Sequence, residues 1–251
     1  MSVVRAAADG ELETKIRFYT LPPRGVEWPY LLVNCRNYRE LFRRRFEHAI
    51  LDTGVELFFN RLRLKGYPEW FLTMWKGLAK RLSKLFEGKL WVVIPDVPSD
   101  YHPSDWADGS NVELTLKNVE DFITVDGVDW VVVIQSRFDD LLSYYSSLKR
   151  TKEIVGDYPR VAIGTACKTR NLRFIIEVCK ATRAHFPRSH VHAFGLTLTA
   201  LPMVARYIDS WDSLAYNFRG GRLCKTQAER AECFEKYLER VEQCLRLVQS
   251  T

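Results

Sequence analysis

The run Trp130-Val-Val-Val-Ile-Gln135 is the clearest strand signal in this sequence. Its β-branched residues favour an extended, buried strand, and its only polar residue, Gln135, stands at the end. Short apolar runs of this kind alternate along the chain with longer segments of helical spacing. Such alternation predicts parallel strands that are joined by helices.

Eight short apolar, β-branched or aromatic runs are present: Lys15–Tyr19, Tyr30–Cys35, Ala49–Asp52, Leu90–Pro95, Trp130–Gln135, Arg160–Gly164, Val191–Gly195 and Tyr207–Asp212. Helical segments are expected between most of them: Tyr38–Glu47, Glu56–Leu64, Glu69–Phe86, Asp139–Arg150, Thr169–Phe186 and Pro202–Ile208. Eight strands and this length are typical of a closed (β/α)8 TIM-like barrel. An open dinucleotide-binding sheet is the alternative, but no GxGxxG motif follows the early strands. The first two runs are so close together that a hairpin or an irregular entry to the barrel is expected there.

The chain is expected to form one α/β domain over residues 1–251. The barrel core should extend from about residue 13 to residue 218, and no repeat or linker interrupts it. A long amphipathic helix is predicted at 226–248, where one face should pack on the core. The apolar residues of that face are Phe234, Tyr237, Leu238, Val241, Leu245 and Val248.

The composition, with 47% hydrophobic and 27% charged residues, is that of an ordinary globular protein. No run approaches the roughly 20 apolar residues that cross a bilayer, and the first residues lack the apolar segment of a signal peptide. A cytoplasmic location, without membrane contact, is therefore expected. The six cysteines form no CxxC pair, so disulfides are not expected. A metal site and a cofactor are not expected either.

The net charge of +6 favours a nucleic-acid partner. Basic residues gather at 36–45, which includes Arg43 and Arg44, and again at Arg219, Arg222 and Lys225. Contact of these five side chains with phosphates is one interpretation, and it applies if the substrate is a nucleic acid. A solvated face is the other interpretation of each patch.

Polar or small residues end five of the predicted strands. They are Asp52, Asp96, Gln135, Gly164 with Thr165, and Asp212. The carboxyl ends of barrel strands meet on one face, which is where barrel enzymes hold their reacting groups. Considered alone, Asp212 could equally be the N-cap of a helix that begins with Ser-Leu-Ala. Together the five strand ends predict an active site.

The chemistry that fits this set is recognition of a purine next to cleavage of a glycosidic bond. A glutamine amide and backbone N–H groups can donate to a carbonyl oxygen, while a carboxylate accepts from ring N–H and amine groups. Two further carboxylates can serve as nucleophile and general acid/base at an anomeric carbon.

The order of these motifs resembles that of the tRNA-guanine transglycosylase superfamily, (β/α)8 enzymes that exchange guanine for a 7-deazaguanine. The motifs that carry the resemblance are Ile50-Leu-Asp-Thr-Gly54, Ile94-Pro-Asp-Val-Pro98, Val133-Ile-Gln135, Ala162-Ile-Gly164, His192-Ala-Phe-Gly-Leu196 and Asp209-Ser-Trp-Asp-Ser-Leu-Ala-Tyr216. They extend over residues 30–218, and their shared order is more specific than any one of them.

The resemblance implies a role for each strand end. Asp212 is expected to be the nucleophile on C1′ and Asp52 the general acid/base, although the two roles could be exchanged. Asp96 would bind the base edge, Gln135 and the Gly164 backbone would read its carbonyl, and Thr165 would lie near the 7-substituent. A free 7-deazaguanine base is the implied co-substrate, and members of this family commonly form homodimers.

The sequence departs from the tRNA enzymes after the nucleophile segment. Those enzymes carry a Cys-x-Cys-x-x-Cys…His zinc site, whereas here Cys224, Cys233 and Cys244 stand at other spacings and no histidine follows His192. The resemblance is therefore greatest to the compact, often virus-encoded relatives that act on DNA. Three alternatives stay open: tRNA as the substrate, a catalytically inactive barrel that binds nucleic acid or purine, and a hydrolase that releases a base from a nucleoside.

Overall fold

The computed structural model describes residues 16–219 and 222–249. The expected start of the barrel near residue 13, Lys15 of the first predicted strand and the side chains of Arg219 and Val248 lie outside the described part. None of the described helices combines the length and the apolar composition that crossing a membrane requires.

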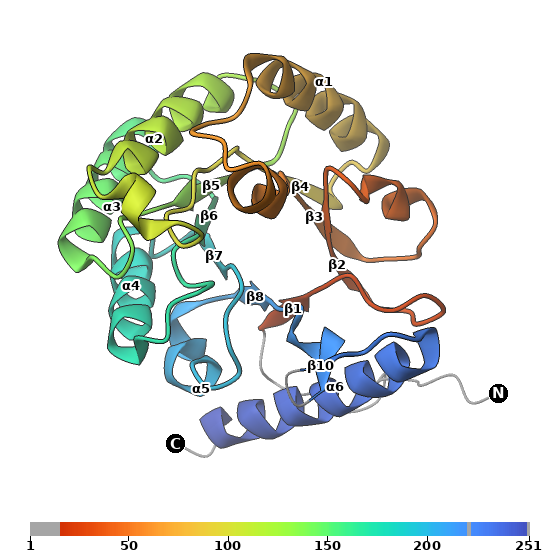
Figure 1. The fold of residues 1–251 in the computed structure, drawn as a ribbon. Helices are drawn as coiled ribbons and strands as arrows, with labels where there is room; N and C mark the ends of the chain where they lie inside the picture. Colours follow the sequence, from red (N-terminus) through yellow and green to blue (C-terminus); the bar gives the residue numbers. More distant parts are fainter. Residues whose placement is uncertain (1–15, 220–221, 250–251) are drawn as a thin grey trace.

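The chain folds into a (β/α)8 TIM-like barrel, as the sequence predicts (Figure 1). Its strands are β1 (Arg17–Tyr19), β2 (Tyr30–Asn34), β3 (His48–Asp52), β4 (Leu90–Val93), β5 (Trp130–Ile134), β6 (Arg160–Ile163), β7 (His190–Ala193) and β8 (Ser210–Asp212). Every neighbouring pair is parallel, and β1 lies beside β8. A bridge between Thr20 and Leu31 joins β1 to β2 and closes the ring.

The helices that surround the strands are α1 (Glu69–Leu85), α2 (Ser110–Ile123), α3 (Leu141–Val155), α4 (Leu172–His185), α5 (Leu201–Val204) and α6 (Gln227–Gln249). Shorter helical turns are η1 (Tyr38–Phe42), η2 (Glu56–Arg61), η3 (Pro103–Trp106), η4 (Ala205–Tyr207) and η5 (Ala215–Asn217). A small antiparallel hairpin, β9 (Phe218–Arg219) with β10 (Arg222–Leu223), precedes α6. The sequence did not predict α2, and it predicted longer helices where η1 and η2 stand.

Of the two alternatives for the first two strands, the hairpin is wrong and the irregular entry to the barrel is confirmed. β1 and β2 run parallel, and the backbone N–H of Thr20 donates to the carbonyl of Tyr30 at 3.1 Å. No helix covers the connection of residues 21–29. Instead the outer face of this seam packs against α6, where the Phe18 and Tyr237 rings lie 5.6 Å apart and Trp28 meets Phe234 at 5.6 Å (Figure 1).

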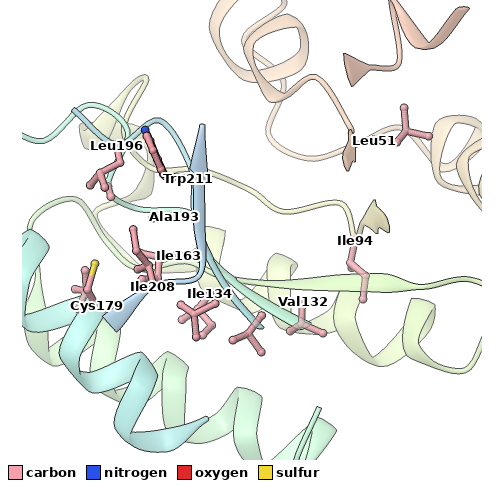
Figure 2. Close-up of a cluster of buried hydrophobic side chains, with 14 of the residues drawn as sticks. Leu51, Ile94, Val132, Ile134, Ile163, Cys179, Ala193, Leu196, Ile208 and Trp211 are labelled. Atoms are coloured by element: carbon pink, nitrogen blue, oxygen red, sulfur yellow. The ribbon is translucent and has the colours of Figure 1, made fainter. Parts of the chain in front are cut away.

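Alternation along the strands separates two cores. Outward residues such as Val132, Ile163 and Trp211 pack against the helices (Figure 2). Inward residues fill the barrel, among them Tyr19, Ile50, Val93, Val131, Val133 and Ala162. Since successive side chains of a strand point to opposite faces, Asp52 shares the inward side with Ile50, Gln135 with Val133, and Gly164 with Ala162. The polar strand ends are thus placed inside the mouth of the barrel.

The structure corrects the expectation of unpaired cysteines. Cys224 and Cys233 form a disulfide that joins the segment before α6 to the second turn of that helix. Cys35, Cys167, Cys179 and Cys244 are free thiols.

Candidate active site

Three carboxylates meet at the carboxyl end of the barrel. Asp52 ends β3, Asp96 lies in the loop after β4, and Asp212 ends β8. Their charges affect one another: the charge of Asp212 helps raise the pKa of Asp52, and the charge of Asp52 helps raise the pKa of Asp96. The fold therefore brings together residues that are 160 positions apart, by the difference between 212 and 52.

Asp52 is held at the edge of the mouth by the turn that follows it. Its Oδ2 accepts from the backbone N–H of Gly54 at 2.9 Å. Gly54 has a φ of +81°, a region that L side chains rarely adopt, so this turn requires glycine. Burial, opposed by the Gly54 N–H and assisted by the charge of Asp212, raises the pKa of Asp52 to about 6. A carboxyl group with that pKa can both give and take a proton near neutral pH.

Asp96 lies deeper and contacts Gln135. The Nε2 of Gln135 donates to Oδ2 of Asp96 at 2.6 Å, and only 5% of Asp96 is exposed. Burial, followed by the charge of Asp52, raises the pKa of Asp96 to about 7, although the Gln135 hydrogen bond acts in the opposite direction. The carboxyl is thus poised between its neutral and ionised forms at neutral pH.

Gly164 provides the space that the Gln135 side chain occupies. A Cβ at position 164 would lie 2.2 Å from Nε2 of Gln135 and 2.7 Å from Cγ1 of Val133, so no larger residue fits without displacement. The other end of the amide, Oε1 of Gln135, is buried without a hydrogen-bond partner among the described residues. Thr165 is buried beside it, and its hydroxyl lies 3.0 Å from the Ser136 hydroxyl.

Asp212 is fixed by two donors rather than by a helix. Its Oδ1 accepts from the backbone N–H of Gly195 at 2.9 Å, and Nε2 of His192 lies 3.3 Å from the same oxygen. The alternative interpretation of Asp212 as an N-cap is wrong, because the next helical turn, η5, begins at Ala215. Asp212 is buried at the end of β8 and faces the same mouth as Asp52.

A fourth carboxylate, Asp100, was missed by the sequence reasoning. It is buried in the loop after β4, and its Oδ1 has no partner among the described residues. Burial raises its pKa to about 6, while the positive charge of Lys168 opposes this. The signal that could have found it is its place four residues after Asp96 in a proline-stiffened loop.

A groove of 790 Å³ leads away from Asp212 along α6. It begins at Gly195 and Ser213, which flank the carboxylate in space and in sequence. Its walls include the cations Lys168, Lys236 and Arg240 and the carboxylates Glu56 and Glu232, of which Glu232 pairs with Lys236. Four aromatic residues also line it: Tyr101, Tyr216, Phe218 and Tyr237. Phe218 is 55% exposed, which leaves its ring open for stacking.

The structure places four of the five side chains expected to contact phosphates, since that of Arg219 lies outside the described part. Arg222 and Lys225 are exposed, and they follow Phe218 of the groove closely in the chain. Arg43 and Arg44 lie away from this groove. Arg43 lines a separate hollow together with the last turn of α1. The chain passes from that turn into the start of β4, so the hollow lies towards the end of the barrel opposite the site. Arg44 is 13% exposed and donates to Glu40 and to two backbone carbonyls, so its guanidinium is already engaged.

Within residues 16–219 and 222–249, no cluster of histidine, cysteine and carboxylate side chains has an arrangement that could hold a metal ion. A scan of protein-family models and a search of curated proteins find no match to this sequence.

Proposed function

We propose that this protein is a guanine transglycosylase, which replaces guanine in DNA with a 7-deazaguanine base through a covalent glycosyl-aspartate. The observation that carries the proposal is the meeting of Asp52, Asp96 and Asp212 at one barrel mouth, beside an amide that can read a base. Buried carboxylates are costly unless they serve a purpose, and titratable groups with perturbed pKa values gather at functional sites.

In the first half-reaction, a carboxylate oxygen of Asp212 attacks C1′ of the target nucleotide. The bond from C1′ to the guanine nitrogen breaks as the new C1′–O bond forms, and Asp52 gives its proton to the departing base. In the second half-reaction, Asp52 takes a proton from the incoming 7-deazaguanine, whose nitrogen displaces Asp212 from C1′. Protons and bonds balance over the two steps, so no cofactor is needed.

The pKa of Asp52, about 6, supports its role as the proton carrier. A general acid and base works best when its pKa is close to the working pH. Asp212 instead has its Oδ1 held by two hydrogen-bond partners, which orient the carboxylate that the proposal makes the nucleophile.

The contact between Asp96 and Gln135 supports recognition of a guanine-like base. In the protein without ligand these side chains bond to each other. A base with an N–H and amine edge beside a carbonyl would take the place of this contact, with Asp96 as acceptor and the Gln135 amide as donor. The bare backbone of Gly164 allows a flat ring to approach closely.

The groove beside Asp212 supports a polymeric substrate. Its three cations and its aromatic rings suit a flipped-out nucleotide and its flanking phosphates. We assign DNA because Cys224 and Cys233 are bonded to each other, in the segment where the tRNA enzymes hold zinc. tRNA is the alternative substrate of the same chemistry.

A base-exchange assay tests the proposal. DNA and tRNA that carry radiolabelled guanine are incubated separately with the protein and a 7-deazaguanine, with Asp212→Asn as the inactive control. We expect release of label from DNA, matched by uptake of the new base, and a covalent DNA adduct that Asp212→Asn does not form.

Each other outcome points elsewhere. Release from tRNA alone would reassign the substrate. Release without uptake of the 7-deazaguanine would favour the hydrolase. Binding of nucleic acid without release from either polymer would favour an inactive, nucleic-acid-binding barrel and contradict the proposal.

A further inference from the structure

A chain of hydrogen bonds runs through the inside of the barrel and ends on Asp212. Nε2 of His190 lies 2.7 Å from Oγ of Ser210, and the same hydroxyl lies 2.8 Å from Nδ1 of His192. Nε2 of His192 then faces Oδ1 of Asp212 at 3.3 Å. The register explains the chain, because β7 pairs with β8 and places His192 opposite Ser210.

The charge of Asp212 fixes the direction of every bond in this chain. An ionised carboxylate only accepts, so the proton of His192 must be on Nε2. Nδ1 of His192 is then an acceptor and receives the Ser210 hydroxyl proton. The Ser210 oxygen in turn accepts from Nε2–H of His190. For rings that carry one proton, this arrangement places the hydrogen of each histidine on Nε2.

The surroundings keep the His192 ring in place. His192 is 1% exposed, and its ring has edge contacts with Phe194 at 4.5 Å and with Tyr19 at 5.7 Å. Burial lowers the pKa of His190 to about 4 against the opposing charge of Asp209, and positive charge on His192, Arg17 and Arg183 acts in the same direction as burial. His190, at the end of the hydrogen-bond chain farthest from Asp212, is thus a neutral imidazole.

Both donors on Asp212 meet the same oxygen. The Gly195 N–H and the His192 Nε2–H point at Oδ1, and neither of these bonds uses Oδ2. A carboxylate held in this way attacks with the oxygen that is not engaged, since attack by Oδ1 would break two hydrogen bonds.

We propose that His192 is a positioning residue which, with the Gly195 N–H, fixes Oδ1 of Asp212 so that Oδ2 is the attacking atom, and that Ser210 and His190 hold His192 in the tautomer this requires. The inference rests on the proposed function for the identity of the nucleophile. As the Oδ2–C1′ bond forms, Oδ1 becomes the carbonyl oxygen of the ester. When the incoming base breaks that bond, its electron pair returns to the carboxylate, and the same two donors stabilise the returning charge.

Two substitutions of His192 separate positioning from packing. His192→Gln keeps an amide N–H near the place of Nε2, whereas His192→Phe keeps a ring against Tyr19 and Phe194 but has no donor. Loss of a hydrogen bond to a charged group should lower kcat of His192→Phe roughly 10- to 100-fold with little change in KM. His192→Gln should recover most of that loss. Equal loss in both variants, or no loss in His192→Phe, would overturn the positioning role.

Histidine NMR provides a readout that needs no substrate. In protein labelled with ¹⁵N at histidine, the ring nitrogens of His190 and His192 should report neutral rings with hydrogen on Nε2. Ser210→Ala should convert His192 to a mixture of tautomers, because its Nδ1 loses the hydroxyl donor. A signal for hydrogen on Nδ1 of His192 in the unsubstituted protein would refute the chain, whatever the activity. If the tautomers are as assigned but no nucleic acid is a substrate, the proposed function fails and the hydrogen-bond chain stands.

Discussion

Replacing Asp96 with Asn should stabilise the protein above neutral pH. Burial, with the charge of Asp52 assisting, raises the pKa of Asp96 from an ordinary 3.8 to about 7. The folded protein therefore binds this proton more tightly than the unfolded chain does. Stability is lost as the pH rises from about 4 towards the folded pKa, and the loss is complete above about pH 7. Asn has the shape of the protonated carboxyl and can still accept from Gln135, but it never ionises.

The size of the effect follows from the two pKa values. One pKa unit corresponds to about 1.4 kcal/mol, so a rise of about three units costs up to about 4 kcal/mol near pH 8. Near pH 4 the folded protein holds the proton and the unfolded chain is about half protonated, so the cost falls below about 1 kcal/mol. Asp96→Asn should thus be more stable than the unsubstituted protein by several kcal/mol at the higher pH and nearly equal at the lower.

Urea unfolding followed by circular dichroism at both pH values measures this difference. The matched control is Asp126→Asn, which changes an exposed carboxylate and should leave the free energy of unfolding unaltered at either pH. A gain for Asp96→Asn that is the same at both pH values, or no gain near pH 8, would refute the reasoning. Ionisation of the Asp96 carboxyl would then cost no folding stability, which contradicts the buried position described above.

Three further predictions concern Gly164, the Gln135 amide and the groove beside Asp212. Gly164→Ala should lower the free energy of unfolding by about 1–3 kcal/mol in urea, because its methyl group would lie 2.2 Å from Nε2 of Gln135. Gly77→Ala, in a helix with open space around it, should not destabilise. Gln135→Leu removes a hydrogen bond that lowers the pKa of its partner carboxyl, so the pH midpoint in the same unfolding series should move upward. Replacing Lys168 and Arg240 together with Ala should weaken DNA binding and reduce the slope of log affinity against log salt by about 2; an unchanged slope would remove the groove from the interface.

The strands and the polar strand ends could be predicted from sequence because local pattern determines both. A run such as Trp130–Ile134 is strand-like by itself, and alternation then fixes that Gln135 points inward with Val133. The collinear order of the ends was sufficient to place Asp52 and Asp212 on one face, since all strands of a parallel barrel share a direction.

What escaped prediction depends on contacts between distant segments. The parallel closure of β1 on β2 is stabilised by α6, which lies more than 200 residues later in the chain. Arg44 has the same sequence signature as any surface arginine. Its pair with Glu40 is local, but its two backbone partners depend on the approach of the loop at Pro23 and Val26. The pairing of Cys224 with Cys233 needs the turn that starts α6. His192 stands in one of the motifs of the resemblance, but the motif assigned it no role, because its contacts arise from the pairing of β7 with β8.

α2 was missed although its residues have helical spacing. Val112, Leu116 and Val119 recur at intervals of four and three and are all buried. The stripe directly follows the polar, turn-forming segment of residues 99–110, and α2 starts after Gly109 in the left-handed region, without a side-chain cap. The helix is stabilised by packing rather than by a strong start signal.

The pairing of β1 with β8 has a consequence for folding during synthesis on the ribosome. Arg17–Tyr19 aligns with Ser210–Asp212, so β1, which meets β2 early, gains its second neighbour only when β8 has been synthesised. At synthesis rates of about 5–20 residues per second, this leaves the amino-terminal edge of the sheet open for roughly ten seconds or more. Until α6 emerges, Phe18 and Trp28 have no cover on their outer face. Before β8 has been synthesised, the ring cannot close and Asp212 cannot join Asp52 at its mouth. Assembly of the site is therefore among the last events of folding.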